Sequence, residues 1–600
     1  MKTFGVVRLG FFSTLSAALT ILCSFHHFVC IAGHAAEITF PKDGGVLDVR
    51  NFGAKPDDAG NDTAAIQKAL DAFPNGNRII YLPAGTWIVS DTLRWPDGKH
   101  GGEAQKRTIL QGAGRSVTRL RLPDATAGFA DGKTKALIWT GGSPAQRFRN
   151  AVRDLNDWIG CLGGHPQTKT PNFDRLAASG VLFKNAYCVG ASCNPSRAAI
   201  LSELTPHRSG LYNNRQKMRE VLPDAELMPR YFSRNGYWSA GSGKMLHYVI
   251  DPQSWDDYFP DKAKDNPFPR TFYPTKRPVN LPRAGEWQYD ETDWAALDVT
   301  DEEFGGDWLL TKWIGEQLQR AHDKPFFLAC GIYRPHEPWF VPKKYFEPFP
   351  LETIQPGPGY KADDLDDIPP AGQKLGRNRY FAHIQKEGQW KKGIQAYLAS
   401  IHFADAMLGR VLDALEKSPQ RDNTIVVLWS DHGWHLGEKE HWQKFTGWRI
   451  CDRVPLMVRV PKGMAPLPEG TRAGSVCDRP VSLVDLFRTL TDLCGLPDKP
   501  DIMGGSLVPL LRDPSMNWPH AAITHLDQPE SYAISTERWR YIHYKSGDEE
   551  LYDIASDPHE WTNLAPKAEH AAKLAEMRTL APKEVNVLVL PKETKEAPTK

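Results

Sequence analysis

A cysteine at the predicted start of a helix is the residue of this chain whose type and position point most clearly to a chemical role. It opens the string Cys193-Asn-Pro-Ser-Arg197, in which Pro195 suits the first helical turn and Arg197 lies one turn further on. The free N–H groups at a helix N-terminus favour an anion. For a single cysteine, a small buried apolar side chain is the ordinary alternative. The string therefore places a cysteine beside a potential anion site.

Candidate partners for this cysteine follow three strand-like apolar runs. Residues 237–247, 325–336 and 423–433 each begin apolar and end in polar side chains. These side chains include Lys244, His247, His336, Asp431 and His432. Because the carboxyl ends of strands in an open α/β sheet share the edge where ligands bind, we expect one common site.

The motifs and their order resemble those of the sulfatase family. The resemblance rests on CNPSR within residues 171–212, on GKMLH, YRPHEPW and SDHGWHLGE, and on Lys444 in HWQKF. The pairing of GKMLH with SDHGWHLGE, and LYDIASDPHEWTNLA at 551–565, are most similar to the iduronate-2-sulfatase branch. The similarity extends over about residues 154–565.

The resemblance implies a cofactor, a metal and a set of site residues. Cys193 would be oxidised to Cα-formylglycine by a formylglycine-generating or anaerobic maturation enzyme. Its hydrate would attack sulfur with one hydroxyl and expel sulfate with the other. The implied catalytic residues are Cys193, Arg197, Lys244, His247, His336 and Lys444. The implied calcium ligands are Asp154, Cys193, Asp431 and His432. Arg197, Lys244 and Lys444 would clamp the sulfate, and His247 and His336 are the acid–base candidates.

Two positions depart from the family pattern. The signature normally continues to a glycine about ten residues after the cysteine, but Ser202 is followed here by Glu203. The family also begins with an apolar strand that ends in two metal-binding aspartates, whereas this chain has Arg153 followed by Asp154. Asp157 has the wrong spacing to replace the missing carboxylate. We therefore expect weak calcium binding and impaired activity.

The segment before Asp154 has a different pattern. Short strand-like runs recur with glycine-rich corners between about residues 37 and 150, as in the coils of a parallel β-helix. DVRNFGAKPDDAGNDTAAIQKAL (48–70) resembles the opening of pectate-lyase-like β-helix proteins. The later coils of such a fold are missing, so we predict a truncated β-helix segment without lyase activity. The polar run RFRNAV (147–152) is unsuited to a central parallel strand, and we interpret it as a strand of this segment.

These patterns predict the fold class and the domain boundaries. The fold is α/β, with an alkaline-phosphatase/sulfatase-like mixed sheet flanked by helices. A smaller C-terminal α+β subdomain follows the sheet, and a truncated parallel β-helix-like segment precedes it. We expect a signal peptide over 1–36, the β-helix segment over 37–152, the catalytic domain over 153–515 and the C-terminal subdomain over 516–600.

The N-terminal segment and the composition indicate where the protein acts and which partners are not expected. The first 36 residues carry Lys2 and Arg8, then an apolar run and small residues near Ala35, which predicts an exported protein, periplasmic or secreted. The alternative for this segment is an uncleaved membrane anchor. No later part of the sequence resembles a membrane-spanning helix. With 73 basic and 72 acidic residues among 600, no excess charge points to nucleic acid. Nine cysteines, two of them in the signal, show neither a disulfide framework nor a zinc motif.

The sequence thus predicts an exported hydrolase of sulfate esters on a sulfated polysaccharide or glycosaminoglycan. Two alternatives stay open. The first is a phosphonate or phosphodiester hydrolase of the same superfamily. The second is an inactive chimeric or carbohydrate-binding protein, because the first metal aspartate is Arg153.

Overall fold

The chain divides into two compact units, Met1–Pro144 and Ala145–Lys600. The computed structural model describes residues 46–72, 78–94, 108–112, 118–123, 138–139, 146–152, 154–279, 281, 292–464, 466–499, 503–583 and 585–586. The predicted signal segment 1–36 and Arg153 lie outside these residues. Within the described ranges, no helix combines the length and the apolar character that crossing a membrane requires.

The first unit contains stacked parallel strands. β1 (Val46–Asp48), β2 (Arg78–Leu82) and β5 (Thr108–Gly112) form one parallel sheet. β3 (Gly85–Ile88) pairs in parallel with β6 (Thr118–Arg121), and β4 (Leu93–Arg94) pairs likewise with β7 (Ile138–Trp139). The run β5, β6 and β7 therefore stacks strand by strand on the run β2, β3 and β4, which is the construction of a β-helix. α1 (Thr63–Asp71) adds Ile66 and Leu70 to a core around Trp87.

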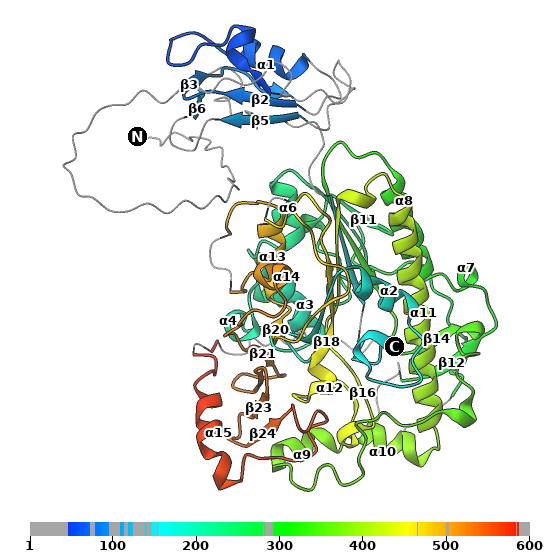
Figure 1. The fold of residues 1–600 in the computed structure, drawn as a ribbon. Coiled ribbons are helices and arrows are strands. Elements are labelled where there is room, and N and C mark those ends of the chain that lie inside the picture. Colours follow the sequence, from blue (N-terminus) through cyan, green and yellow to red (C-terminus); the bar gives the residue numbers. More distant parts are fainter. Residues whose placement is uncertain are drawn as a thin grey trace. The chain divides into compact units, whose positions relative to one another are not determined.

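A nine-stranded mixed sheet organises the second unit (Figure 1). Its strand order is β11 (Asp257–Phe259), β10 (Trp238–Gly243), β13 (Phe326–Ile332), β8 (Gln146–Val152), β15 (Thr424–Ser430), β18 (Arg453–Arg459), β9 (Val181–Tyr187) and β19 (Ser475–Cys477), and β20 (Val481–Ser482) also pairs with β9. Strands β8, β10, β11, β13 and β15 are parallel, whereas β18 is antiparallel to both of its neighbours. The predicted α/β mixed sheet is confirmed.

Strand β8 corrects the interpretation of residues 147–152. These residues do not belong to the β-helix unit: β8 lies between β13 and β15 and pairs in parallel with both. Backbone hydrogen bonds on both sides fix the strand, and they do not depend on the polarity of its side chains. Val152 is in register with Ile332 and with Ser430. The polar residues that follow β8, β13 and β15 therefore start from the same edge of the sheet.

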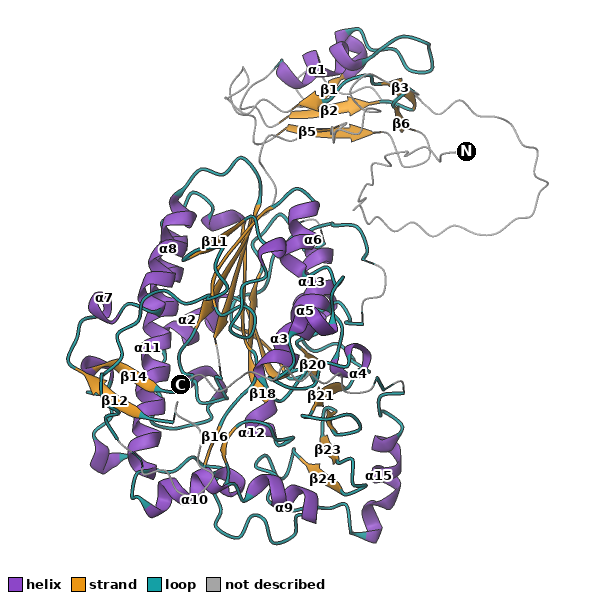
Figure 2. Cartoon of the chain, turned by 180° about the vertical axis from the view of Figure 1, so that it is seen from behind, coloured by secondary structure: helices purple, strands orange, loops and turns teal. Residues whose placement is uncertain are grey.

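Helices cover both faces of this sheet (Figure 2). α2 (Pro171–Ser179), α8 (Asp307–Gln319) and α11 (Trp390–Glu416) share one apolar core, and α3 (Cys193–Ser202), α6 (Met228–Arg234) and α13 (Asp485–Leu493) share the other. Val426 and Leu428 of β15 belong to the first core, whereas Ile425 and Val427 belong to the second. This alternation explains why all seven residues of β15 are buried.

Shorter elements form the connections and the C-terminal part. Two small sheets pair β12 (Trp294–Leu297) with β14 (Trp339–Pro342), and β16 (His435–Leu436) with β17 (Trp442–Gln443). The short helices are α4 (Pro206–Ser209), α5 (Met218–Val221), α7 (Asp301–Phe304), α9 (Pro370–Gly376), α10 (Arg379–Lys386), α12 (Arg449–Asp452) and α14 (Val508–Arg512).

In its described residues, the C-terminal subdomain contains a four-stranded antiparallel sheet and one α-helix. Its elements are β21 (Ala522–His525), β22 (Tyr532–Ser535), β23 (Trp539–His543), β24 (Glu549–Asp553) and α15 (Ala571–Arg578). The fully buried Arg540 of β23 donates to the carboxylate of Asp452 and to the carbonyl of Gly447. This sheet therefore supports the segment that follows Lys444.

Candidate active site

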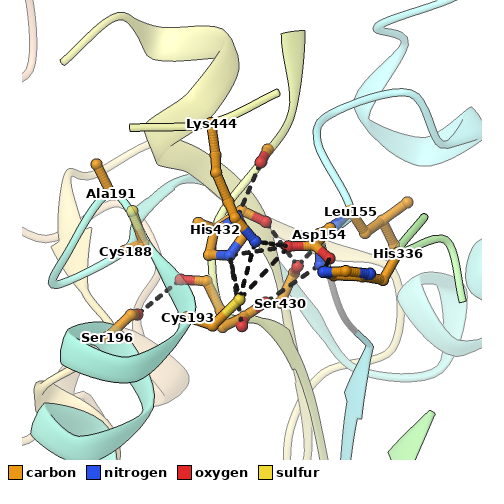
Figure 3. A network of polar contacts seen from close by, with 12 residues as sticks. Asp154, Leu155, Cys188, Ala191, Cys193, Ser196, His336, Ser430, His432 and Lys444 are labelled. Carbon is orange, nitrogen blue, oxygen red and sulfur yellow. Dashed lines mark hydrogen bonds and ion pairs between the residues drawn. The ribbon is translucent and has the colours of Figure 1, made fainter. Parts of the chain in front are cut away.

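Cys193 is the first residue of α3, and its side chain is fully buried. Its Sγ lies 3.0 Å from Lys444 Nζ and 3.1 Å from His432 Nε2 (Figure 3). The three residues come from three separate parts of the chain: a helix start, the end of β15 and the segment after β17. The convergence predicted around the cysteine is therefore present.

Asp154 is the centre of this cluster. Its Oδ1 lies 2.8 Å from His432 Nε2 and 3.2 Å from Lys444 Nζ, and its Oδ2 lies 3.5 Å from His336 Nε2. Although burial by itself raises the pKa of this carboxyl, His336, Lys444 and His432 hold the pKa of Asp154 well below its usual range. The group is therefore a buried anion surrounded by cations and imidazoles.

The backbone of Asp154 is fixed as firmly as its side chain. Its φ of 50° lies in the left-handed region, which is uncommon for a residue other than glycine. Its N–H donates to Asp431 Oδ1 at 3.1 Å, and its carbonyl accepts from the Tyr397 hydroxyl at 2.8 Å. The end of β8 is thus joined to the end of β15 and to α11, and the surrounding structure holds the strained conformation.

Asp431 is held by a buried arginine. Arg197 Nε donates to Asp431 Oδ2 at 2.7 Å, and both side chains are fully buried. Arg197 Nη1 also donates to the carbonyl of Lys244, and Ser196 Oγ donates to the carbonyl of Asp431 at 2.6 Å. Arg197 therefore positions Asp431 and the segment that carries Lys244; its predicted part in the sulfate clamp stays a prediction.

His432 presents one ring nitrogen to the cluster. Its Nδ1 lies 2.9 Å from the carbonyl of Gly433, a contact that requires a proton on Nδ1 and leaves Nε2 to face Asp154 and Cys193. Burial lowers the pKa of this imidazole, but the carboxylates of Asp431 and Asp154 outweigh that effect and raise the pKa to about 9. A metal ion would take the same Nε2 lone pair in place of the proton.

Four of these residues form a group that fits a metal ion. One ligand atom from each of Asp154, Cys193, Asp431 and His432 lies within 4.8 Å of the others, and all four residues are buried. Two carboxylates suit a hard cation such as Ca²⁺. The sulfur of Cys193 would be replaced by an oxygen if the residue became formylglycine, which makes the donor set harder still. The residues present therefore fit the predicted calcium site.

His336 lies on the opposite side of Asp154 from Cys193 (Figure 3). Its Nδ1 is 2.5 Å from the carbonyl of Glu337 and 3.1 Å from the Tyr333 hydroxyl. The carbonyl requires a proton on Nδ1, so the Nε2 that faces Asp154 is the nitrogen available for proton transfer. Tyr333 was missed by the motif-based reasoning, although it stands only three residues before His336.

Two other predicted residues, Lys244 and His247, contact the same tyrosine. The ring of Tyr248 lies 4.0 Å from Lys244 Nζ and packs edge-on against His247, with ring centroids 4.9 Å apart. Asp157 does not belong to the metal-ligand group: its Oδ2 pairs with Arg453 Nη1 at 2.7 Å. Asp157 therefore does not lie where the missing carboxylate would be needed.

Glu203 occupies the position where the family pattern has a glycine. It is the C-cap of α3 and has a φ of 66°, in the left-handed region where helices usually end with glycine. Its side chain is fully buried, and burial raises the pKa of its carboxyl to about 8 despite the nearby Lys499. The helix that carries Cys193 therefore ends in an unfavourable conformation with a poorly solvated acid.

Comparisons with known proteins match each of the two units to a protein family. A sequence model of the sulfatase family matches residues 153–496, and one for the C-terminal region of N-sulphoglucosamine sulphohydrolase matches residues 437–584. A family description of rhamnogalacturonase A/epimerase, pectate lyase-like, matches residues 46–154. The first unit is thus pectate-lyase-like in sequence as well as in strand stacking.

Individual relatives match the second unit over most of its length. A sulfatase of Formosa agariphila is 38% identical over 72% of this chain and 85% of its own. The iduronate 2-sulfatase of Mus musculus is 32% identical over 58% of this chain and 68% of its own. The phosphonate monoester hydrolase of Agrobacterium radiobacter shares the fold, with a TM-score of 0.56 and 24% identity over 72% of this chain and 94% of that protein. From the matched family and the buried cluster around Cys193, we conclude that the chain belongs to the sulfatase family of sulfuric ester hydrolases.

Proposed function

We propose that this protein removes sulfate from a sulfated polysaccharide or glycosaminoglycan, with formylglycine at position 193 and calcium as cofactors. The observation that carries the proposal is the position of Cys193 Sγ, 3.0 Å from Lys444 Nζ and beside the carboxylate of Asp154. The similarity to iduronate 2-sulfatase supports a sugar sulfate as the substrate.

Different residues of the cluster would hold the metal ion, stabilise the developing charge and position the ligands. When present, formylglycine supplies a hydrated aldehyde as the nucleophile toward sulfur, and calcium supplies positive charge to the sulfate oxygens. Asp154, Asp431, His432 and residue 193 would hold the ion. Lys444 places a further positive charge beside position 193, where negative charge would develop during attack. Arg197 keeps Asp431 in place from the protein interior.

Proton transfer falls to the imidazoles. His336 keeps its Nδ1 proton on the carbonyl of Glu337 and presents Nε2 toward the cluster. It can therefore accept a proton from the nucleophile or deliver one to the departing sugar oxygen, which leaves as a hydroxyl, and His247 is the second candidate. Lys244, whose backbone carbonyl accepts from Arg197, would contact the sulfate from the adjacent segment.

Export and maturation complete the proposal. The predicted signal segment implies that the protein acts outside the cytoplasm, and the CNPSR string implies processing by a formylglycine-generating or anaerobic maturation enzyme.

The decisive experiment combines mass spectrometry with a paired assay. The protein is produced together with a maturation enzyme, and the mass of the peptide that contains Cys193 is measured, with an established sulfatase as the control. We expect the mass of formylglycine at Cys193 and hydrolysis of an aryl sulfate in preference to an aryl phosphodiester. Cys193→Ala should abolish turnover. An unmodified cysteine beside a converted control, or faster phosphodiester hydrolysis, would contradict the proposal and favour an inactive protein or a phosphonate or phosphate ester hydrolase.

A further inference from the structure

An aromatic cavity of about 280 Å³ lies next to the catalytic cluster. Its walls include Tyr248, Phe268, Tyr273 and Tyr333, and Thr271 and Asn266 add polar groups. This volume is close to the lower end of the range for small-molecule sites, about 300–1000 Å³. The cavity is lined by loops and by parts of α7 and α8 between residues 248 and 334, and it contains none of the residues assigned to the metal or the nucleophile.

Two tyrosines join the cavity to the cluster. The Tyr333 hydroxyl lies 3.1 Å from His336 Nδ1, and the Tyr248 ring lies 4.0 Å from Lys244 Nζ. The two hydroxyls are 3.4 Å apart, and Phe268 packs edge-on against both rings, with centroid distances of 5.6 Å and 5.0 Å. These three rings therefore form one continuous wall that begins at the sulfate-binding residues and continues into the cavity.

The outer part of the cavity is open to solvent. Tyr273 is 47% exposed and Tyr248 is 37% exposed, so both rings can be reached from solvent. Tyr248 also has a φ of 58°, so its position costs backbone energy that the surrounding structure must supply. Tyr273 and Tyr333 line a second cavity as well, of about 260 Å³. Tyr273 and Tyr333 thus border two neighbouring cavities.

We propose that this cavity binds a pyranose ring of the glycan, next to the ring that carries the sulfate ester. The inference rests on the proposed function and names a subsite for the same substrate. Aromatic faces pack against the apolar C–H faces of sugars, and the hydroxyl and amide groups of the cavity can meet the equatorial hydroxyls. Because Tyr248 contacts Lys244 and Tyr333 contacts His336, a ring bound against Tyr273 would be the neighbour of the ring whose sulfate reaches the cluster.

A matched pair of variants tests the subsite. Tyr273 lines the cavity, whereas the neighbouring Phe272 does not and is similarly exposed, at 44%. Removing a stacking ring costs on the order of tenfold in binding. We therefore expect Tyr273→Ala to lower kcat/KM about tenfold on a disaccharide of 2-O-sulfated uronate and glucosamine. The same variant should stay within about twofold of the parent on 4-nitrophenyl sulfate, which has no second ring.

Two controls complete the design. Phe272→Ala should behave like the parent protein on both substrates, and Tyr273→Phe should restore disaccharide turnover because it keeps the ring. Equal disaccharide kcat/KM values for Tyr273→Ala and Phe272→Ala would overturn the subsite.

A binding measurement separates this inference from the proposed function. In a Cys193→Ala background, calorimetric titration with the same disaccharide measures affinity without turnover. Weaker binding after Tyr273→Ala supports the subsite even if no variant hydrolyses sulfate. Unchanged binding in that background would overturn the subsite, whatever the outcome of the sulfatase assay.

Discussion

Lys444 and His336 are the side chains whose contacts most directly support a catalytic role. Lys444 Nζ lies 3.0 Å from Cys193 Sγ, and His336 Nε2 faces Asp154. Removing one preorganised charge-stabilising group typically costs about 10²–10³ in kcat. We expect Lys444→Ala and His336→Ala each to reduce sulfatase turnover by this order while the circular dichroism spectrum stays that of the parent.

The exposed Lys391 provides the matched control for this prediction. Lys391→Ala, on the surface of α11, should leave turnover unchanged. Parent-like rates in Lys444→Ala or His336→Ala would show that the motif has been placed on the wrong residues.

At the level of single residues, short contiguous motifs predicted which side chains converge around Cys193. Cys193, Asp154, Asp431, His432, His336 and Lys444 are brought together as expected. The supporting residues could not be predicted this way. Tyr397, on α11, and Tyr333 act through hydrogen bonds to Asp154 and His336, and only the folded sheet brings Tyr397 near a residue 243 positions away.

A prediction about the stability of α3, the helix that carries Cys193, follows from the conformation of its C-terminal end. Glu203 occupies a left-handed C-cap, a conformation that costs a residue other than glycine about 1–3 kcal/mol. Glu203→Gly should therefore raise the free energy of unfolding, measured by chemical denaturation.

The pH dependence of that effect follows from the raised pKa of Glu203, about 8 in the folded protein against an ordinary value of 4.5 for an exposed glutamate. The folded state keeps its proton over this interval while the unfolded state loses it. The contribution to stability is thus fully present below about pH 4.5 and is lost as the pH rises toward 8, by about 1.4 kcal/mol for each unit. Glu203→Gln, which keeps the strain but cannot ionise, should remove this slope; a parent-like slope would refute the assignment.

A second prediction at the scale of elements concerns the end of strand β8, which leads to the proposed metal site. Arg153 follows β8 directly and stands where the family has a metal-binding aspartate. Two like charges about 4 Å apart repel by about 4 kcal/mol at an effective dielectric constant near 20. We expect weak Ca²⁺ binding by the unmodified chain and tighter binding by Arg153→Asp, measured by calorimetric titration. Tight binding by the unmodified chain would show that Arg153 does not disturb the site.

The position of β8 also shows the limit of pattern-based prediction for elements. A buried parallel strand is expected to be apolar, and β13 and β15 follow this rule. QRFRNAV does not, yet its backbone pairs with both neighbours along its length. The error arose because pairing depends on tertiary position, which the local hydrophobic pattern does not contain.

At the scale of the whole molecule, the division between the two units makes truncation informative. A chain that begins at Ala145 keeps β8, whereas a chain that begins at Arg153 lacks the strand between β13 and β15. We expect the 145–600 chain to be recovered folded, with a cooperative denaturation curve, and the 153–600 chain to be insoluble or unfolded. Equal behaviour of the two chains would mean that β8 contributes little to the sheet.

The place of β8 has a mechanical consequence. The chain enters the second unit through this strand, and the strand is held by parallel ladders on both sides. Tension applied to the N-terminal unit would therefore load two rows of backbone hydrogen bonds together, in shear, rather than open them one after another. Anchoring this protein by its first unit would transmit any pulling force directly to the strand that ends two residues before Asp154.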